Sequence, residues 1–359
     1  MKIAFIGPRG FNYPAGIDRV STELAKRLAR RNHDITFYHR TETIKPSSNL
    51  VCRHIPTLAT SYLETPVYAI GATFHALFQG FDVIHFHGLG SAWCIPIVRL
   101  FTSARIVATI HAPDWLGSRW NNIAKRVLKT SARITLKFSH VVTTVSQSNL
   151  QELSQLSDRE IKIIANGIDI PTLRTPKKII SIGLSKDNYI LFLGRLTPGK
   201  GCEYLIEAFS KLIQDKKLVI AGDTIHDHDY VKMLKEMSGP QVEFLGWVEG
   251  ELKEELLSNA YLFVQPSDLE GLSGTLIEAM SYGLCIVASD IPSDIEVMED
   301  SGLYFKQGMA DDLKDILKQL LGDHNQIMLK GQLARERVSK HFAWGPIVDK
   351  FEDIYKSGT

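Results

Sequence analysis

The feature that most constrains this fold is an alternation of strand-like and helix-like segments, which runs through the chain twice. The first series starts with a strand-like run at residues 2–6, an amphipathic stretch at about 17–31 and a second strand-like run at 34–39. Its later strand-like runs, rich in Val, Ile and Thr, are residues 82–87, 105–111 and 141–146. Strands separated by helices predict βαβ units and hence a parallel sheet.

The alternation stops at residues 169–188, where two prolines and two adjacent lysines favour a connection between domains over a regular element. It then restarts with strand-like runs and one helix-like stretch: 189–194, 203–213 (helix), 218–222, 242–245, 262–265 and 285–289. Because 359 residues exceed what one core usually accommodates, we expect two Rossmann-like α/β domains, at residues 1–170 and 171–342. The tail from 335 to 356 is expected to form one or two closing helices.

Composition restricts the setting of these domains. The isolated cysteines, Cys52, Cys94, Cys202 and Cys285, show no paired-ligand or disulfide spacing, and no apolar run approaches the roughly 20 residues of a spanning helix. We therefore expect a cytoplasmic protein with reduced thiols. Residues 1–170 hold 20 Lys and Arg against 11 Asp and Glu, whereas residues 171–359 hold 21 against 29. The basic half suggests an anionic partner, although attraction between the halves is an equal alternative.

Two glycine-containing loops follow predicted strands at positions where parallel sheets bind ligands. The loop from Gly7 to Gly16 precedes a helix, and either a phosphate-binding loop or a flexible turn fits it. The loop from Gly194 to Gly201 carries Arg195 and Lys200, which are able to converge on one diphosphate. The alternative is that both cations are simply solvated. The position of the loop after a predicted strand favours a role in diphosphate binding.

The strongest candidate is the loop and helix start at residues 267–280. Glu270 lies in the loop, where a carboxylate accepts hydrogen bonds from sugar hydroxyls, and Glu278 lies in the first helical turns. A capping box formed by Thr275 and Glu278 is the alternative explanation of the second carboxylate. Seven residues of loop and helix lie between the two glutamates, so we expect them to hold two ends of an extended ligand rather than act as a hydrolase pair.

Histidines end two of the predicted strands. His85 and His87 supply only two possible metal ligands, so we expect no metal site, and we interpret His85 as a core residue while His87 stays open. His111, at the end of the next strand, is a candidate to hydrogen-bond a sugar hydroxyl.

Taken together, these segments resemble a family 4 glycosyltransferase of the GT-B fold along nearly the full chain. Glu270 and Glu278 match the EX7E motif, residues 194–201 match the GR…KG element, and residues 166–169 match the NGID junction. The resemblance implies two domains facing a central cleft, with the last helix, in residues 343–359, returning to the first domain. One departure is Ala15-Gly16, where the family often has paired glycines, so backbone contact there depends on Gly16.

The resemblance also implies retaining, metal-independent transfer of a hexose-type sugar from a UDP-, GDP- or ADP-sugar, with no cofactor. Arg195 and Lys200 would stabilise the leaving diphosphate, Glu278 would bind ribose, and His111 would contact the transferred sugar. Glu270 would hold sugar and phosphate together with backbone amides of four residues: Gly271, Leu272, Ser273 and Gly274.

Residues 120–138 interleave basic and apolar side chains in a helical pattern. This segment fits either an anionic membrane surface or an ordinary helix packed on the sheet. With the basic first half it favours a glycan or lipid-linked acceptor in envelope or extracellular polysaccharide synthesis, on the inner face of a membrane, and no nucleic acid. The rival functions are a nucleotide-sugar epimerase and a non-catalytic nucleotide-sugar-binding protein. A nicotinamide dehydrogenase is disfavoured because GxGxxG and a matched acidic residue after it are absent.

Overall fold

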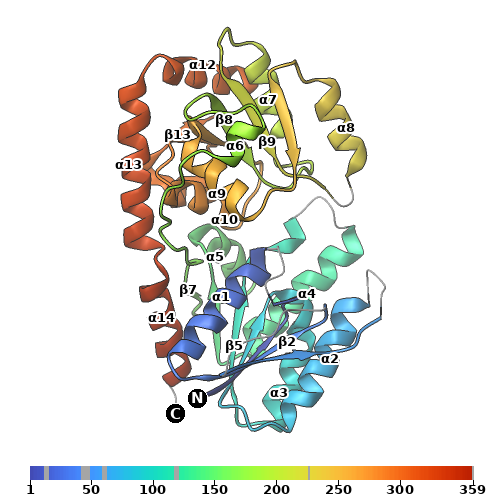
Figure 1. Ribbon diagram of the computed structural model, residues 1–359. Helices are drawn as coiled ribbons and strands as arrows, with labels where there is room; N and C mark the ends of the chain where they lie inside the picture. The colour runs from blue at the N-terminus through green and yellow to red at the C-terminus, as the bar shows by residue number, and fades with distance from the viewer. Residues whose placement is uncertain (12–15, 42–48, 59–62, 117–120, 225–226, 358–359) are drawn as a thin grey trace. The chain divides into compact units, whose positions relative to one another are not determined.

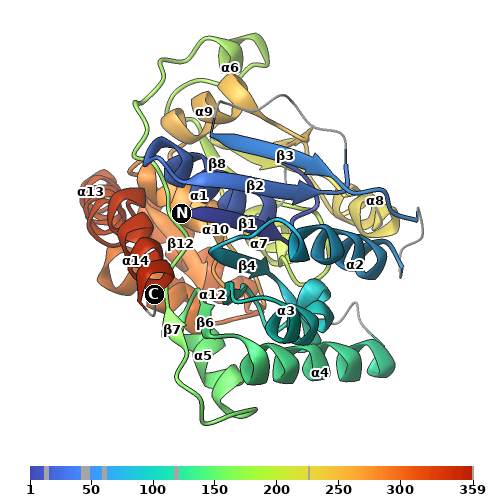
Figure 2. The same ribbon diagram turned by 90° about the horizontal axis from the view of Figure 1, so that it is seen from below.

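The computed structural model describes residues 1–11, 16–41, 49–58, 63–116, 121–224 and 227–357. The chain divides into two compact units, which Figures 1 and 2 show from two directions. Unit 1 consists of Met1–Gly167 and Trp344–Thr359, and unit 2 consists of Ile168–Ala343. Each unit contains its own parallel sheet.

Among the described residues of unit 1, seven strands form a parallel sheet in the order β3-β2-β1-β4-β5-β6-β7. Their bounds are β1 Lys2–Ile6, β2 Asp34–His39, β3 Leu50–His54, β4 Val83–His87, β5 Arg105–Ile110, β6 Val141–Thr144 and β7 Lys162–Ile163. Strands β1, β4 and β5 are almost entirely buried, as expected of strands covered on both faces. The strand order reverses between β1 and β4. At such a reversal the loops that follow the two strands run in opposite directions and leave a crevice where parallel sheets bind ligands.

Two groups of helices cover this sheet. Helices α1 (Gly16–Arg30) and α14 (Trp344–Lys356) share one apolar cluster with β1 and β2. Helices α2 (Glu64–Leu77) and α3 (Ile95–Phe101) share another, and α4 (Asn122–Phe138) contacts α3. Helix α5 (Gln147–Ser154) and the short turns η1 (Leu89–Cys94) and η2 (Asp114–Leu116) complete the described helical segments. Figure 2 shows α2, α3 and α4 following one another along one side of the sheet.

In the described part of unit 2, six parallel strands have the order β10-β9-β8-β11-β12-β13, again with a reversal, here between β8 and β11. The strands are β8 Tyr189–Leu193, β9 Lys217–Ala221, β10 Val242–Gly246, β11 Leu262–Gln265, β12 Ile286–Ser289 and β13 Leu303–Phe305. The helical segments are α6 Lys178–Ser181, α7 Cys202–Ser210, α8 His228–Glu236, α9 Gly250–Asn259, α10 Gly274–Ser281, α11 Pro292–Met298, η3 Glu299–Ser301, α12 Ala310–Leu321 and α13 His324–His341.

The predicted alternation is confirmed in both halves, and most strand bounds agree within a residue or two. The interpretation of residues 169–188 as a connection is wrong: the stretch lies within unit 2 and contains α6. The buried Glu255 carboxylate explains this, because it accepts hydrogen bonds from the backbone amides of Lys177, Lys178 and Ile179. A distant carboxylate thus orders a segment whose local sequence favours irregular structure.

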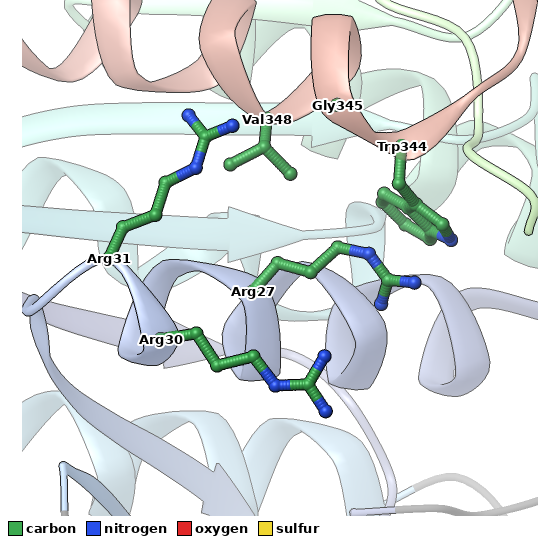
Figure 3. Close-up of a pocket in the computed structure, with 6 residues that line it drawn as sticks. All are labelled: Arg27, Arg30, Arg31, Trp344, Gly345 and Val348. Carbon is green, nitrogen blue, oxygen red and sulfur yellow. The ribbon is translucent and has the colours of Figure 1, made fainter.

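Helix α14 is fixed to unit 1 by two aromatic side chains at its opposite ends. The Tyr355 hydroxyl lies 2.7 Å from Nδ1 of the buried His85. At the other end, the guanidinium of Arg27 lies 4.7 Å from the ring centre of Trp344, beside a pocket between α1 and α14 (Figure 3). A Cβ atom at Gly167 would lie only 2.3 Å from the indole of Trp344. Space, rather than backbone conformation, therefore requires glycine in the Asn-Gly-Ile-Asp sequence.

Replacing Gly167 by alanine should destabilise unit 1, because the added methyl group overlaps the Trp344 indole. We expect a loss of about 1–3 kcal/mol in the free energy of unfolding, as is typical of overpacking. Urea denaturation followed by tryptophan fluorescence measures this loss. Gly345→Ala is the matched control, since a Cβ atom there meets nothing within 4 Å. Equal stability of the two variants would contradict the explanation.

Candidate active site

Two loops of unit 2 meet beyond the carboxyl ends of the neighbouring strands β8 and β11. Gly201 is the N-cap residue of α7 and has a φ of 67°, and a Cβ atom there would lie 1.8 Å from the Pro266 carbonyl oxygen. The Asp268 amide donates a hydrogen bond of 2.9 Å to the Gly199 carbonyl oxygen. Only glycine permits the approach at position 201, which places the loop that follows β8 directly against the loop that follows β11.

This contact brings Lys200 to Glu270. Their side chains form an ion pair, with exposed fractions of 21% and 11%. The same Glu270 oxygen, Oε1, also accepts hydrogen bonds from the Ser267 hydroxyl at 2.8 Å and from Nε2 of Gln265 at 3.0 Å. Glu270 is therefore held by three donors, one of them charged. Gln265 and Ser267 were not singled out from the sequence, because a glutamine at the end of an apolar strand carries no signal of its own.

Arg195 lies in the same loop as Lys200 but differs from it in exposure and in pairing. Its side chain is exposed, and within the described parts of the chain it has no hydrogen-bond or ion-pair partner. The structure thus places one free guanidinium and one paired ammonium in the loop after β8. Both cations remain able to interact with an anion.

The observed start of α10 is not the capping box of Thr275 and Glu278 that the sequence allowed. The helix begins at Gly274, and the Ser273 hydroxyl caps it by accepting a hydrogen bond of 3.3 Å from the Leu276 amide. Thr275 is not the cap, so the capping-box explanation of Glu278 is wrong. Glu278 is buried and instead forms an ion pair of 2.8 Å with Lys253 of α9. Gly271, Leu272 and Ser273 lead into this helix, and Gly274 is its first residue.

Asp294, at the start of α11, is a neighbour of this site that the sequence did not indicate. It is fully buried, and neither carboxyl oxygen has a hydrogen-bond partner in the described structure. Burial raises the pKa of Asp294 well above its usual value; the negative charge of Glu270 raises it further, and Lys200 opposes this effect. Burial thus favours the protonated form of the Asp294 carboxyl group, which lies near the Lys200–Glu270 pair.

In unit 1, three histidines lie near the carboxyl ends of β4 and β5. His85 is a core residue as expected: it is fully buried, and its ring nitrogens lie 2.7 Å from the hydroxyls of Tyr355 and Thr109. Nδ1 of His87 lies 3.2 Å from Nε2 of His111, and both rings are buried. Burial lowers the pKa of His111 to about 4, so its imidazole is neutral near pH 7. No group of three or more His, Cys, Asp or Glu side chains among the described residues is arranged to hold a metal ion.

The first glycine loop of unit 1 is anchored by Asp18, a residue that sequence reasoning passed over. The Asp18 carboxylate accepts hydrogen bonds from the backbone amides of Arg9 and Gly10. Gly16 is exposed and is the first residue of α1, where amide groups lack intrahelical partners. Ala15, the departure from the paired-glycine pattern, lies outside the described residues.

A neutral isostere at position 294 should stabilise the protein increasingly as pH rises. Because folding raises the pKa of Asp294, the native state keeps a proton that the unfolded chain releases above about pH 3.9. Native stability therefore falls with rising pH, by at most about 1.4 kcal/mol per pH unit, until the native pKa is passed. Asp294→Asn removes this loss, so its advantage over wild type in urea unfolding should be larger at pH 8 than at pH 5.

The control for this experiment is Asp315→Asn, which changes a carboxylate that is 70% exposed on α12. Its effect should vary little between the two pH values. A pH-independent effect of Asp294→Asn would contradict the assignment of a buried, protonated carboxyl group.

Comparisons with known proteins agree on one class. Residues 14–171 match the family model described as glycosyltransferase family 4, and residues 175–336 match the model described as glycosyl transferases group 1. N-acetyl-α-D-glucosaminyl L-malate synthase of Bacillus anthracis is 27% identical over 96% of this chain and 94% of the relative. O-antigen chain mannosyltransferase B of Escherichia coli is 25% identical over 99% of this chain and 100% of the relative.

Among solved structures, Anabaena HepE in complex with UDP and glucose superposes with a TM-score of 0.83 and 19% identity, covering 99% of this chain and 100% of HepE. The two family models together span nearly all of the chain, and the structural likeness covers both parallel sheets. The chain belongs to the family 4 glycosyltransferases and is an enzyme with the GT-B fold.

Proposed function

We propose that the protein transfers a hexose-type sugar from a nucleoside-diphosphate-sugar to a glycan or lipid-linked acceptor with retention of anomeric configuration. The observation that carries the proposal is the grouping of Lys200, Glu270 and the start of α10 beside β8 and β11 of unit 2. Cations and the amides at a helix start suit a diphosphate, and carboxylates suit sugar hydroxyls. This grouping supports a donor site within unit 2.

The diphosphate is the part of the donor that the cations would bind. Arg195 has no partner to give up among the described residues, and its guanidinium offers a planar fork of donors. Lys200, by contrast, already neutralises Glu270. A bound diphosphate would therefore compete with Glu270 for the ammonium, and Gln265 and Ser267 would keep the carboxylate in place. The backbone amides of Leu272, Ser273 and Gly274 would add uncharged donors.

The proposed reaction breaks the bond between the anomeric carbon and the diphosphate oxygen and forms a bond from the acceptor oxygen on the same face of the sugar. The acceptor hydroxyl proton passes to an oxygen of the departing diphosphate, so no protein nucleophile or cofactor is required. Arg195 and Lys200 would stabilise the negative charge that develops on the leaving group. Glu270 would fix the sugar hydroxyls. His111, neutral near pH 7, would hydrogen-bond the transferred sugar.

The surface of unit 1 supports an acceptor presented at an anionic membrane. Helix α4 carries five basic residues and no acidic residue: Lys125, Arg126, Lys129, Arg133 and Lys137. Large apolar side chains lie exposed on α3, which contacts α4, at Leu100 (76%) and Phe101 (67%), and on α2 and its C-cap at Phe74 (65%) and Phe78 (72%). Basic residues beside exposed aromatic and aliphatic groups fit a lipid surface. Trp120, the start of the predicted basic segment, lies outside the described residues.

Two further observations bear on this surface. In the part of the chain that the structure describes, no helix has the length and apolarity needed to cross a bilayer. The E. coli relative is described as an O-antigen chain mannosyltransferase, which supports an envelope polysaccharide as the acceptor.

Thermal-shift titration with UDP, GDP, ADP and a dinucleotide tests the donor site. UDP is the first choice, because the Anabaena HepE structure contains it. We expect one nucleoside diphosphate to raise Tm selectively. Arg195→Ala should weaken its binding about 10- to 100-fold, which corresponds to the loss of a charge-assisted hydrogen bond. Arg133→Ala, an exposed arginine on α4, is the control and should bind like wild type. No stabilisation by any nucleoside diphosphate would refute the donor site.

Sedimentation with vesicles tests the membrane surface. Wild type should bind vesicles rich in phosphatidylglycerol and should be released by salt, because screening weakens the attraction of basic residues. Lys129→Glu combined with Arg133→Glu should lower the partition coefficient more than tenfold, since each basic residue contributes about 1 kcal/mol. Phe74→Ser combined with Leu100→Ser should lower it without changing the salt dependence. Absence of wild-type binding would show that this face does not meet lipid.

A further inference from the structure

Helix α9 has four charged side chains, and three of them bind the segment that precedes β8. Glu254 forms an ion pair of 2.8 Å with Arg174, and Glu251 forms one of 2.8 Å with Lys178. Glu255 accepts the three amide hydrogen bonds at the start of α6. Residues 251, 254 and 255 share one face of the helix, because their spacing is three and four. The helix is thereby held in place along this face.

Lys253 is the remaining charged residue of α9, and it points the other way. Its Nζ lies 2.8 Å from Oε1 of Glu278 on α10, and the exposed fractions of the two side chains are 21% and 6%. Because α9 is anchored through its opposite face, the ammonium is presented to Glu278 from a fixed support. Its partial exposure leaves it in reach of a ligand that contacts Glu278.

We infer that Lys253 both positions the Glu278 carboxylate and donates a hydrogen bond to a ribose hydroxyl of the donor nucleotide, an inference that rests on the proposed function. A ribose hydroxyl both donates and accepts a hydrogen bond, whereas a carboxylate only accepts and an ammonium only donates. A hydroxyl that meets the pair donates to Glu278 and accepts from Lys253. A deoxyribose hydrogen does neither, so the pair discriminates between ribonucleotides and deoxyribonucleotides.

The alternative role of Lys253 is purely structural: it neutralises a buried carboxylate and so maintains α10. The two roles predict different effects of Lys253 on nucleotide affinity. A structural role changes the affinity for every nucleotide by the same factor. The positioning role changes the affinity only for nucleotides that carry the recognised hydroxyl, so a cycle of protein and ligand changes separates them.

The experiment measures by calorimetry the affinity of wild type and variants for the nucleoside diphosphate that stabilises the protein and for its 2′-deoxy and 3′-deoxy forms. We expect wild type to lose about tenfold or more with one deoxy form, as expected for a hydrogen bond to a charged group. Lys253→Met should bind the ribonucleotide several-fold more weakly and the deoxy form unchanged. Lys253→Arg should restore much of the discrimination. Lys232→Met, an exposed lysine on α8, is the matched control.

The outcomes are distinguishable. If Lys253→Met loses the same factor with ribonucleotide and deoxy form, the positioning role is overturned while the proposed donor site stands. If wild type does not discriminate between the two ligands, the inference also fails. If wild type binds no nucleoside diphosphate at all, the proposed function fails together with it. Circular dichroism and Tm without nucleotide check that each variant is folded.

Discussion

The contact between Gly201 and the carbonyl oxygen of Pro266 is the constraint on which the candidate site depends. The loops that follow parallel strands lie at the same edge of the sheet, but this alone does not determine how closely two of them approach. With no side chain at position 201, the loop after β8 lies against the loop after β11, and Lys200 reaches Glu270. Any larger residue would separate the cation from the carboxylate, even if strands β8 and β11 were unchanged.

Much of the fold was predictable from the sequence because local pattern and tertiary structure agree there. Buried parallel strands appear as Val- and Ile-rich runs that end in small or polar residues, and β1, β2 and β11 have the expected bounds. Strands β3, β7 and β13 were missed, since they are short or partly exposed and lack such a run. Segment 169–188 was misjudged because the order of α6 comes from Glu255, some 77 residues away in the chain.

The candidate site, like the fold, could be predicted from the sequence only in part. Motif spacing pointed to Arg195, Lys200, Glu270, Glu278 and His111, and their roles as donor and sugar ligands stay predictions. The partners of these residues could not be predicted, because Gln265, Lys253 and His87 come from other elements and meet them only in the folded chain. Asp294 is the extreme case: its significance arises from burial near Glu270 and Lys200, a property that no residue type reveals.

Unit 1 is built from both ends of the chain, and this has a consequence for synthesis on the ribosome. Unit 2 is continuous, and its two ends meet where the Ile168 amide donates to the Phe342 carbonyl oxygen. It can therefore complete its hydrogen bonds as soon as residue 343 leaves the exit tunnel. Unit 1 emerges first but must wait for α14, which supplies Trp344, Phe351 and Tyr355 to its core. The half of the enzyme that is made first is thus the half that finishes folding last.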